Sequence, residues 1–298
     1  MIPIAAVARA WNAFFHAQEA AYTIAVFRIV FGVLLLTNAA LFVRHARLWI
    51  GPDGFFSHDS YRAIYGHSRF TLLRYLPPTD GWVGAVMAAH VMSAALLTIG
   101  FATRWSAAAA FITLLSIHHR NPVLVYGGDD VLRLLGFLLI FSRAGAALSV
   151  DALVDGRPIG DPAVGDAWCT RLMQLQVSFV YFAAFLNKLE GRSWLEGTAG
   201  FYAVEVADFR RHRLPRFART LFWSQTGTWS VLATELLLGP AIWIRELRYP
   251  VLALGVTMHV AMDWFMNLQL FGATMIASLL LFVDPAAVGG ALHALRIL

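Results

Sequence analysis

Charged side chains are scarce in this sequence. Only 14% of its 298 residues are charged, whereas 59% are hydrophobic. A soluble domain of this length would carry roughly a quarter charged residues. The apolar residues are also bunched into runs that polar segments separate. The composition therefore predicts an integral membrane protein.

Cysteine is almost absent. A single residue, Cys169, excludes an internal disulfide and a cysteine metal cluster, and we expect no metal. The net charge of +5 requires no nucleic-acid partner, because the arginines are scattered or lie between the apolar runs. The expected partner is the lipid bilayer.

Apolar runs long enough to cross a bilayer recur along the chain. A helical span needs about 20 apolar residues, and only helices satisfy their own backbone in lipid. We therefore predict an all-α, polytopic helical bundle of six to eight spans, with eight favoured. The eight candidates cover approximately 21–43, 81–101, 104–119, 131–148, 168–189, 227–245, 249–265 and 268–284.

The chain shows no internal repeat, so one membrane domain is expected over 21–286, followed by a short tail, 287–298. Residues 1–20 lack the features of a cleaved signal peptide. They predict an amphipathic helix at the membrane surface, anchored by Trp11 and two phenylalanines. The expected location is the inner (cytoplasmic) cell membrane, with many passes. The orientation stays open, because the arginine-rich loops also carry the candidate chemistry.

Arg28 is the first charged side chain inside a predicted span. An ionisable group at the helix centre costs at least about 2.5–3.5 kcal/mol, so it is a functional candidate by default. The alternatives are snorkelling to the surface or a structural pair with a buried acid. Gly32, one turn later, suits close packing of two helices.

The segment "HHRNPVLVYGGDDVLR", 118–133, is the densest polar cluster. Its proline and paired glycines predict a turn, after which Asp129 or Asp130 can cap a helix. One interpretation is a re-entrant turn held by pairing of Arg133 with an acid. The other is the wall of a polar pocket, in which Arg120 and Asn121 bind an anion or a quinone oxygen.

Glu235 and His259 also fall within predicted spans. His259 and Asp263 are four residues apart, so they share one helical face. That spacing also suits metal ligands, but no third ligand follows at a matching distance. The interpretations left are a hydrogen-bonded core histidine and a role in a pocket.

Lys188 is the only lysine, against 22 arginines. Arginine stays protonated, whereas the pKa of lysine shifts readily when the side chain is desolvated. A buried lysine can therefore serve as a general base or a nucleophile. The alternative is an interfacial lysine paired with Glu190 or Glu196, although arginine would serve equally well there.

Three blocks carry a family resemblance: "AVFRIVFG" (25–32), "QVSFVYFAAFLNKLEGRSWLEG" (176–197) and "MHVAMDWFMNLQLFGATMIASLLLFVDP" (258–285). They resemble the membrane part of the vitamin K-dependent γ-carboxylase family. The segment "HRNPVLVYGGDDVLR" is similar to bacterial relatives with a horizontally transferred transmembrane (HTTM) domain. In order, the resemblance covers about 20–286.

The resemblance implies an enzyme that uses a reduced quinone of the vitamin K or menaquinone type and acts on a peptide or protein substrate. Lys188 falls on the lysine that is thought to deprotonate the quinol. The other residues that match family positions are Arg28, Gln176, Trp194, Gly197 and His259.

Two departures from that family affect the expected reaction. The family's assisting histidine precedes an "SVD" motif, and here Ala146 or a neighbour takes its place. The family's large C-terminal extramembrane domain, which grips the substrate, is missing after the last predicted span. We therefore expect quinol chemistry with a lysine base and do not expect true peptidyl-glutamate carboxylation.

Two other function classes compete with the enzyme. One is a non-catalytic membrane protein for peptide maturation, toxin immunity or partner binding. The other is a transporter, against which the lack of an internal repeat argues weakly.

Overall fold

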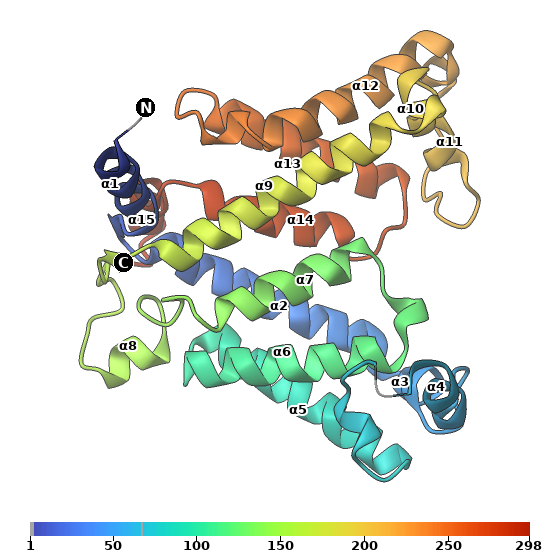
Figure 1. The fold of residues 1–298 in the computed structure, drawn as a ribbon, viewed down its shortest axis with the longest axis horizontal. Helices are drawn as coiled ribbons and strands as arrows, with labels where there is room; N and C mark the ends of the chain where they lie inside the picture. The colour runs from blue at the N-terminus through green and yellow to red at the C-terminus, as the bar shows by residue number, and fades with distance from the viewer. Residues whose placement is uncertain (1–2, 67) are drawn as a thin grey trace. The chain divides into compact units, whose positions relative to one another are not determined.

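The computed structural model describes residues 3–66 and 68–298, and it is mainly helical. Contacts divide the chain into two compact units. The first unit comprises the residues up to Arg171 together with Asp284–Leu298. The second unit comprises Leu172–Val283 (Figure 1). The all-α prediction is confirmed, apart from one pair of two-residue strands.

The first unit is built around three long helices, α2 (Tyr22–Val43), α5 (Asp80–Ile99) and α6 (Thr103–Arg120). α5 packs against both of the others (Figure 1). A Cβ atom on Gly32 would lie 2.3 Å from the hydroxyl oxygen of Thr98 on α5. Only glycine allows this approach of α2 to α5, as the sequence predicted.

Shorter elements complete the first unit. The helices are α1 (Ile4–Phe15), α3 (Ala46–Ile50), α4 (His58–Tyr65), η1 (Leu72–Arg74), η2 (Pro122–Leu124), α7 (Gly127–Leu139), α8 (Val150–Val154) and α15 (Pro285–Ala294). Strand β1 (Gln18–Glu19) pairs antiparallel with β2 (Gly165–Asp166). None of the twelve residues of α1 is buried, and Trp11 is 59% exposed. An exposed apolar helix of this kind suits the predicted place at the membrane surface.

Four long helices dominate the second unit. They are α9 (Trp168–Leu189), which enters the unit at Leu172, α12 (Leu221–Leu238), α13 (Arg248–Phe265) and α14 (Phe271–Leu279). α13 packs against both α12 and α14. The shorter helices are α10 (Arg192–Leu195), α11 (Ala199–Glu205), η3 (Arg216–Arg219), η4 (Ala241–Trp243) and η5 (Leu280–Phe282).

A helix overlaps each of the eight predicted spans, but fewer qualify as membrane-crossing by length and apolar character. Three do so among the described residues: α2, α5 and α9. A fourth qualifies only when Phe271–Phe282 and Pro285–Ala294 are taken as one interrupted span. The structure therefore supports a membrane protein with three or four apolar spans, and the count of eight stays a prediction.

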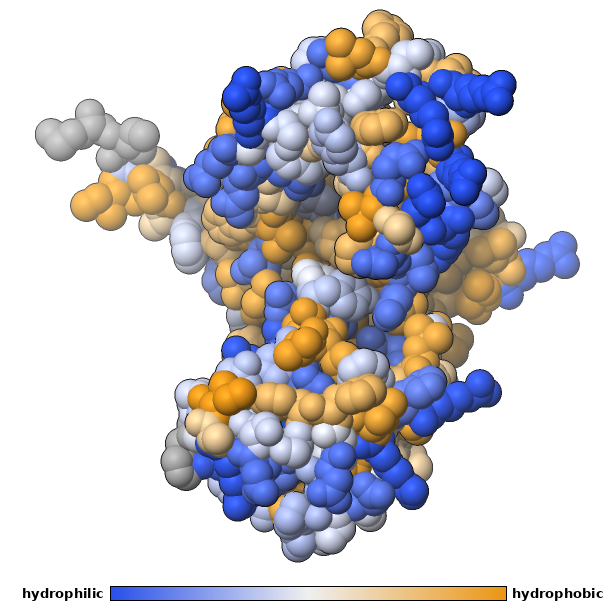
Figure 2. Space-filling view, turned by 90° about the vertical axis from the view of Figure 1, so that its right-hand side faces the viewer, coloured by the Kyte–Doolittle hydropathy of each residue, from blue (hydrophilic) through white to orange (hydrophobic). Residues whose placement is uncertain are grey.

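Large apolar side chains are exposed on several helices. Examples are Trp105 at 77%, Phe179 at 62% and Trp264 at 62% exposure. Figure 2 shows hydrophobic side chains at the surface directly beside hydrophilic ones. Surfaces of this kind are expected where lipid, rather than water, covers the helices.

Candidate functional site

The second unit holds an ion pair between Lys188, in the last turn of α9, and Glu235 on α12. The Nζ and Oε1 atoms lie 2.7 Å apart. The lysine side chain is 23% exposed and the glutamate side chain 9%. The partner is therefore neither Glu190 nor Glu196, because α12 brings a buried acid from 47 residues away. A short, largely desolvated pair of this kind is strong only while both partners are present.

Trp194 on α10 completes the surroundings of Lys188. Its ring centroid lies 5.1 Å from the Nζ atom, a cation–π geometry. The turn between α9 and α10 permits this contact, because a Cβ atom on Gly191 would lie 2.9 Å from the tryptophan ring. The match of this tryptophan to a family position thus has a physical basis in the contact with Lys188.

His259 forms a hydrogen bond with Tyr181, whose oxygen lies 2.9 Å from Nε2 of the imidazole. Which of the two groups donates depends on the tautomer, because a neutral imidazole has one N–H and one lone pair. Ser278, whose hydroxyl donates to the carbonyl of Met275, is a further neighbour of Tyr181. The Nδ1 atom lies on the opposite side of the His259 ring.

Two buried polar atoms of this cluster have no partner among the described residues. They are Nδ1 of His259 and Oε2 of Glu235. Lys188 and His259 interact electrostatically, as do Glu235 and Tyr181. Buried polar atoms without partners are uncommon and often mark a functional site. The cluster combines a proton donor, Nζ, with a carboxylate acceptor, Oε2, and a ring nitrogen, so it suits a ligand that carries a hydroxyl group.

The remaining predicted residues of the second unit lie at different places. Gln176 is half-buried on α9, twelve residues and about three helical turns before Lys188. Asp263 follows His259 by one turn of α13. Among the described residues, no group of three metal-ligating side chains gathers in one place.

Arg28 belongs to the first unit, where it is fully buried. Its guanidinium donates to the carbonyls of Ala144 and Leu148, at 2.7 and 2.5 Å. These carbonyls belong to the turn that follows α7. The contacts correspond to a structural role, with backbone oxygens in place of the expected buried acid.

Arg120 and Asn121, at the end of α6, also bind backbone carbonyls in the first unit. Arg120 donates to Phe56 at 2.8 Å and to Gly51 at 2.9 Å. The amide of Asn121 donates to Trp49 at 2.8 Å. Both side chains therefore hold the loop between α3 and α4 against the end of α6.

Asp129 caps α7, because its Oδ2 atom accepts from the backbone amide of Tyr126. Its Oδ1 atom lies 3.7 Å from Nε2 of buried His118. Arg133 pairs with Asp130, one turn earlier on the same helix. The predicted Arg–Asp pairing is thus confirmed, whereas the N-cap of α7 is Tyr126 and Asp129, the third residue of the helix, completes a capping box with it. His118 is an additional buried neighbour.

Tyr181 was missed by reasoning from the sequence alone. It precedes Lys188 by seven residues, which is two turns of α9, so the two side chains share one face. That spacing is a signal, but an aromatic residue at helical spacing is more often simply part of a core. Ser278 gives no signal before the fold is known.

Comparison with known proteins identifies the family of the chain. The model of the HTTM domain family matches residues 15–286. Sporulation-delaying protein SdpB of Bacillus subtilis (strain 168) is 28% identical over 123 residues, which cover 38% of this chain and 37% of SdpB. No solved structure matches. Because the family model covers more than nine-tenths of the sequence, the chain belongs to the HTTM domain family.

Proposed function

We propose that this protein is a multi-pass enzyme of the cell (inner) membrane that binds the head of a lipophilic quinol and deprotonates it at Lys188. The observation that carries the proposal is the Lys188–Glu235 pair with its unpartnered acceptor atoms. A quinol hydroxyl can accept from Nζ of Lys188. It can also donate to Oε2 of Glu235 or to Nδ1 of His259.

The bound quinol would supply an acidic hydroxyl proton and an electron pair that oxygen can take up. The pair of Lys188 and Glu235 must first make its amine available. Transfer of one proton from Nζ to the carboxylate leaves a neutral pair, which a low-dielectric site favours over separated charges. Nζ then accepts the hydroxyl proton, and the resulting ammonium stabilises the negative charge left on the ligand oxygen.

Trp194 and His259 hold positions around this proton transfer. Trp194 keeps Nζ at the end of α9 through its cation–π contact. In the tautomer with the proton on Nε2, His259 presents the lone pair of Nδ1 in a fixed direction, because Tyr181 holds the opposite side of the ring. The other predicted pocket residues, Gln176 among them, remain candidates for contacts with the rest of the ligand.

The donor and acceptor pattern gives a direct test. A reduced quinone carries hydroxyl protons for both free acceptors, whereas an oxidised quinone carries none. Purified protein in nanodiscs should therefore bind reduced menaquinone about tenfold more tightly than oxidised menaquinone, since unpaired buried acceptors are costly. Glu235→Gln should shrink that preference. Equal affinity for the two redox forms, or no binding of either, would remove the support for a quinol site.

The similarity to SdpB favours a second function. That relative is named for delaying sporulation, and the match covers little more than a third of it. A non-catalytic role in peptide maturation, toxin immunity or partner binding would keep the fold without needing Lys188 chemistry. In that case a Lys188→Arg variant should restore the wild-type phenotype to cells in which the gene is deleted. A quinol enzyme that needs the lysine base predicts that this variant does not restore it.

A further inference from the structure

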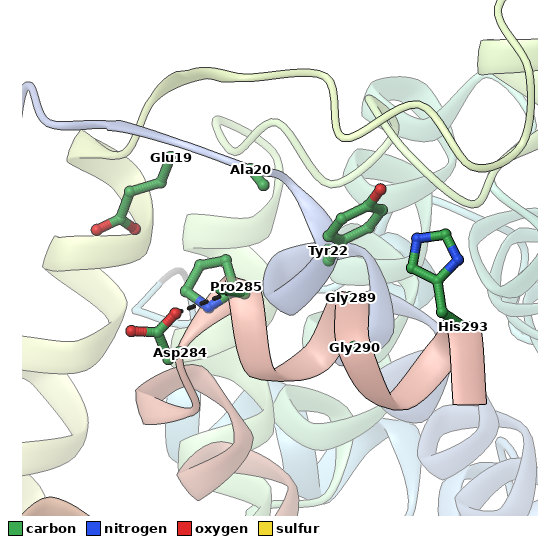
Figure 3. A pocket seen from close by; sticks show the side chains of 9 residues that line it. Glu19, Ala20, Tyr22, Asp284, Pro285, Gly289, Gly290 and His293 are labelled. Atoms are coloured by element: carbon green, nitrogen blue, oxygen red, sulfur yellow. Dashed lines mark hydrogen bonds between the residues drawn. The ribbon is translucent and has the colours of Figure 1, made fainter. Parts of the chain in front are cut away.

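The first unit contains a pocket of about 510 Å³ that has no part in the proposed quinol chemistry. It lies between the chain segment that enters α2 and the helix α15 (Figure 3). The carboxylates of Glu19 and Asp284 lie at one end and His293 at the other. Pro285 and Gly290 contribute apolar surface between them. A pocket of this volume suits a small molecule or a lipid headgroup.

The sequence places this pocket at the surface of the membrane. Tyr22 is the first residue of a candidate span, and Asp284 lies at the break between Phe271–Phe282 and Pro285–Ala294, the two parts of another. The helix α1, with no buried residue, precedes the pocket by a few residues. Side chains at the ends of spans lie at the depth of the lipid headgroups.

Both carboxylates are held in place by their own local structure. Glu19 belongs to β1, whose pairing with β2 sets its backbone. One of its oxygens accepts from the guanidinium of Arg171. Asp284 is the N-cap of α15, and its Oδ1 atom accepts from the amide of Ala286 at 2.9 Å. Each carboxylate thus has a second oxygen that a bound cation can contact.

The aromatic wall of the pocket is also fixed. The hydroxyl of Tyr22 donates to the carbonyl of Gly160 at 2.7 Å. A Cβ atom on Gly289 would lie 2.9 Å from the tyrosine ring, so the ring packs directly on α15. Gly290 differs from its neighbour, because a Cβ atom there would meet nothing within 4 Å. The space beside Gly290 is therefore open to an occupant.

We propose that this pocket binds the head of phosphatidylethanolamine, a zwitterionic phospholipid with a primary ammonium. The ammonium has three donors for the carboxylates of Glu19 and Asp284. The adjacent phosphate lies near the positive end of α15, where an anion is favoured. A quaternary ammonium lacks N–H donors and is recognised by several Trp, Tyr or Phe rings, whereas Tyr22 is the one such ring among the described residues that line this pocket.

The test is a lipid titration of the purified, delipidated full-length protein, followed by native mass spectrometry. Phosphatidylethanolamine, phosphatidylcholine and phosphatidylglycerol with identical acyl chains are compared. The wild type should bind the ethanolamine lipid about three- to fivefold more tightly than the other two, as expected for one partly exposed ion pair. Asp284→Asn removes the charge but keeps a good N-cap, and it should abolish that preference.

Two matched substitutions control the experiment. Asp53→Asn removes another exposed acid outside the pocket and should leave the preference unchanged. Gly290→Leu should fill the open space and weaken binding of the ethanolamine lipid, whereas Gly84→Leu, at an equally open helical position, should not. A wild type without the preference would overturn the proposal. A preference that survives in Asp284→Asn, or one for phosphatidylglycerol, would do so equally.

Discussion

The Nζ atom of Lys188 and the Oε1 atom of Glu235 lie 2.7 Å apart, although 47 residues separate them in the chain. The only lysine of the protein is thus neither a snorkelling surface cation nor the partner of a sequence neighbour. It is held by a buried acid on another helix, and an indole ring lies beside it.

The Lys188–Glu235 pair should be strongly coupled in stability. Lys188→Met leaves the Glu235 charge buried without its partner, which should lower the free energy of unfolding by about 3–5 kcal/mol. The double variant Lys188→Met/Glu235→Gln should lose clearly less than the two single variants added together. Unfolding in mixed detergent micelles measures each value. If the stability losses of the two single variants add up to the loss of the double variant, the two groups do not interact in the micelle-bound protein.

Tyr181→Phe should disturb His259 without unfolding the protein. The substitution removes the hydrogen-bond partner of Nε2, so the orientation of the His259 ring is no longer held. We expect a stability loss of only about 1 kcal/mol together with a clear loss of affinity for reduced menaquinone. The exposed Tyr202→Phe is the matched control. Unchanged quinol affinity in Tyr181→Phe would show that the Tyr181–His259 hydrogen bond has no role in ligand binding.

Arg28 should be intolerant of lysine. One ammonium cannot reach both carbonyls that the guanidinium binds, at Ala144 and Leu148. Arg28→Lys should therefore cost about 2 kcal/mol, since it leaves a buried acceptor unpaired. Arg104→Lys, at an exposed position of α6, should cost almost nothing. Thermal unfolding in detergent compares the two, and equal transition temperatures would argue against the structural role of Arg28.

Arg120 should keep the loop after α3 resistant to proteases. Arg120→Met removes the donors to Gly51 and Phe56, so that loop should open more often. Limited proteolysis followed by mass spectrometry should show faster cleavage within residues 51–57. The exposed Arg62→Met provides the control. If cleavage stays as slow as in the wild type, other contacts hold the loop.

His58, in the loop region between α2 and α5, should make stability depend on pH. Burial, together with the positive charges of Arg62 and Arg120, lowers the pKa of His58 from its ordinary value of 6.5. Because the folded-state pKa is depressed, the stabilising contribution is complete above about pH 6.5 and is lost as the pH falls below it. Thermal unfolding measured at a series of pH values, from above to below about 6.5, should show a falling transition temperature as the pH decreases.

His58→Gln should flatten that pH dependence, because glutamine does not titrate. The exposed His45→Gln should retain it. An identical pH profile in His58→Gln and the wild type would assign the effect to other groups.

The helices could be predicted from the sequence because apolar runs report directly on burial in lipid or protein. The predicted span 168–189 and the helix α9 coincide, and the predicted 21–43 differs from α2 by one residue. The predicted span 131–148 extends too far toward the C-terminus, because α7 ends at Leu139 and a turn follows. Arg28 binds carbonyls of that turn, a contact across more than 110 residues that the sequence does not reveal.

The candidate site was only partly predictable. Lys188, Trp194 and His259 carried signals, namely a unique residue type and the family resemblance. Glu235 was a candidate in its own right, but its pairing with Lys188 could not be predicted, because the acid lies on a helix 47 residues away. The hydrogen bond between His259 and Tyr181 likewise forms only through tertiary packing.

Oxygen consumption by the purified protein in nanodiscs, supplied with reduced menaquinone, tests the central claim most directly. Wild type, Lys188→Ala and Lys188→Arg are compared, with and without bicarbonate. The account predicts uptake by the wild type that both variants lose, because arginine keeps a positive charge but cannot release its proton. Undiminished uptake in Lys188→Arg, or no uptake by the wild type, would contradict it.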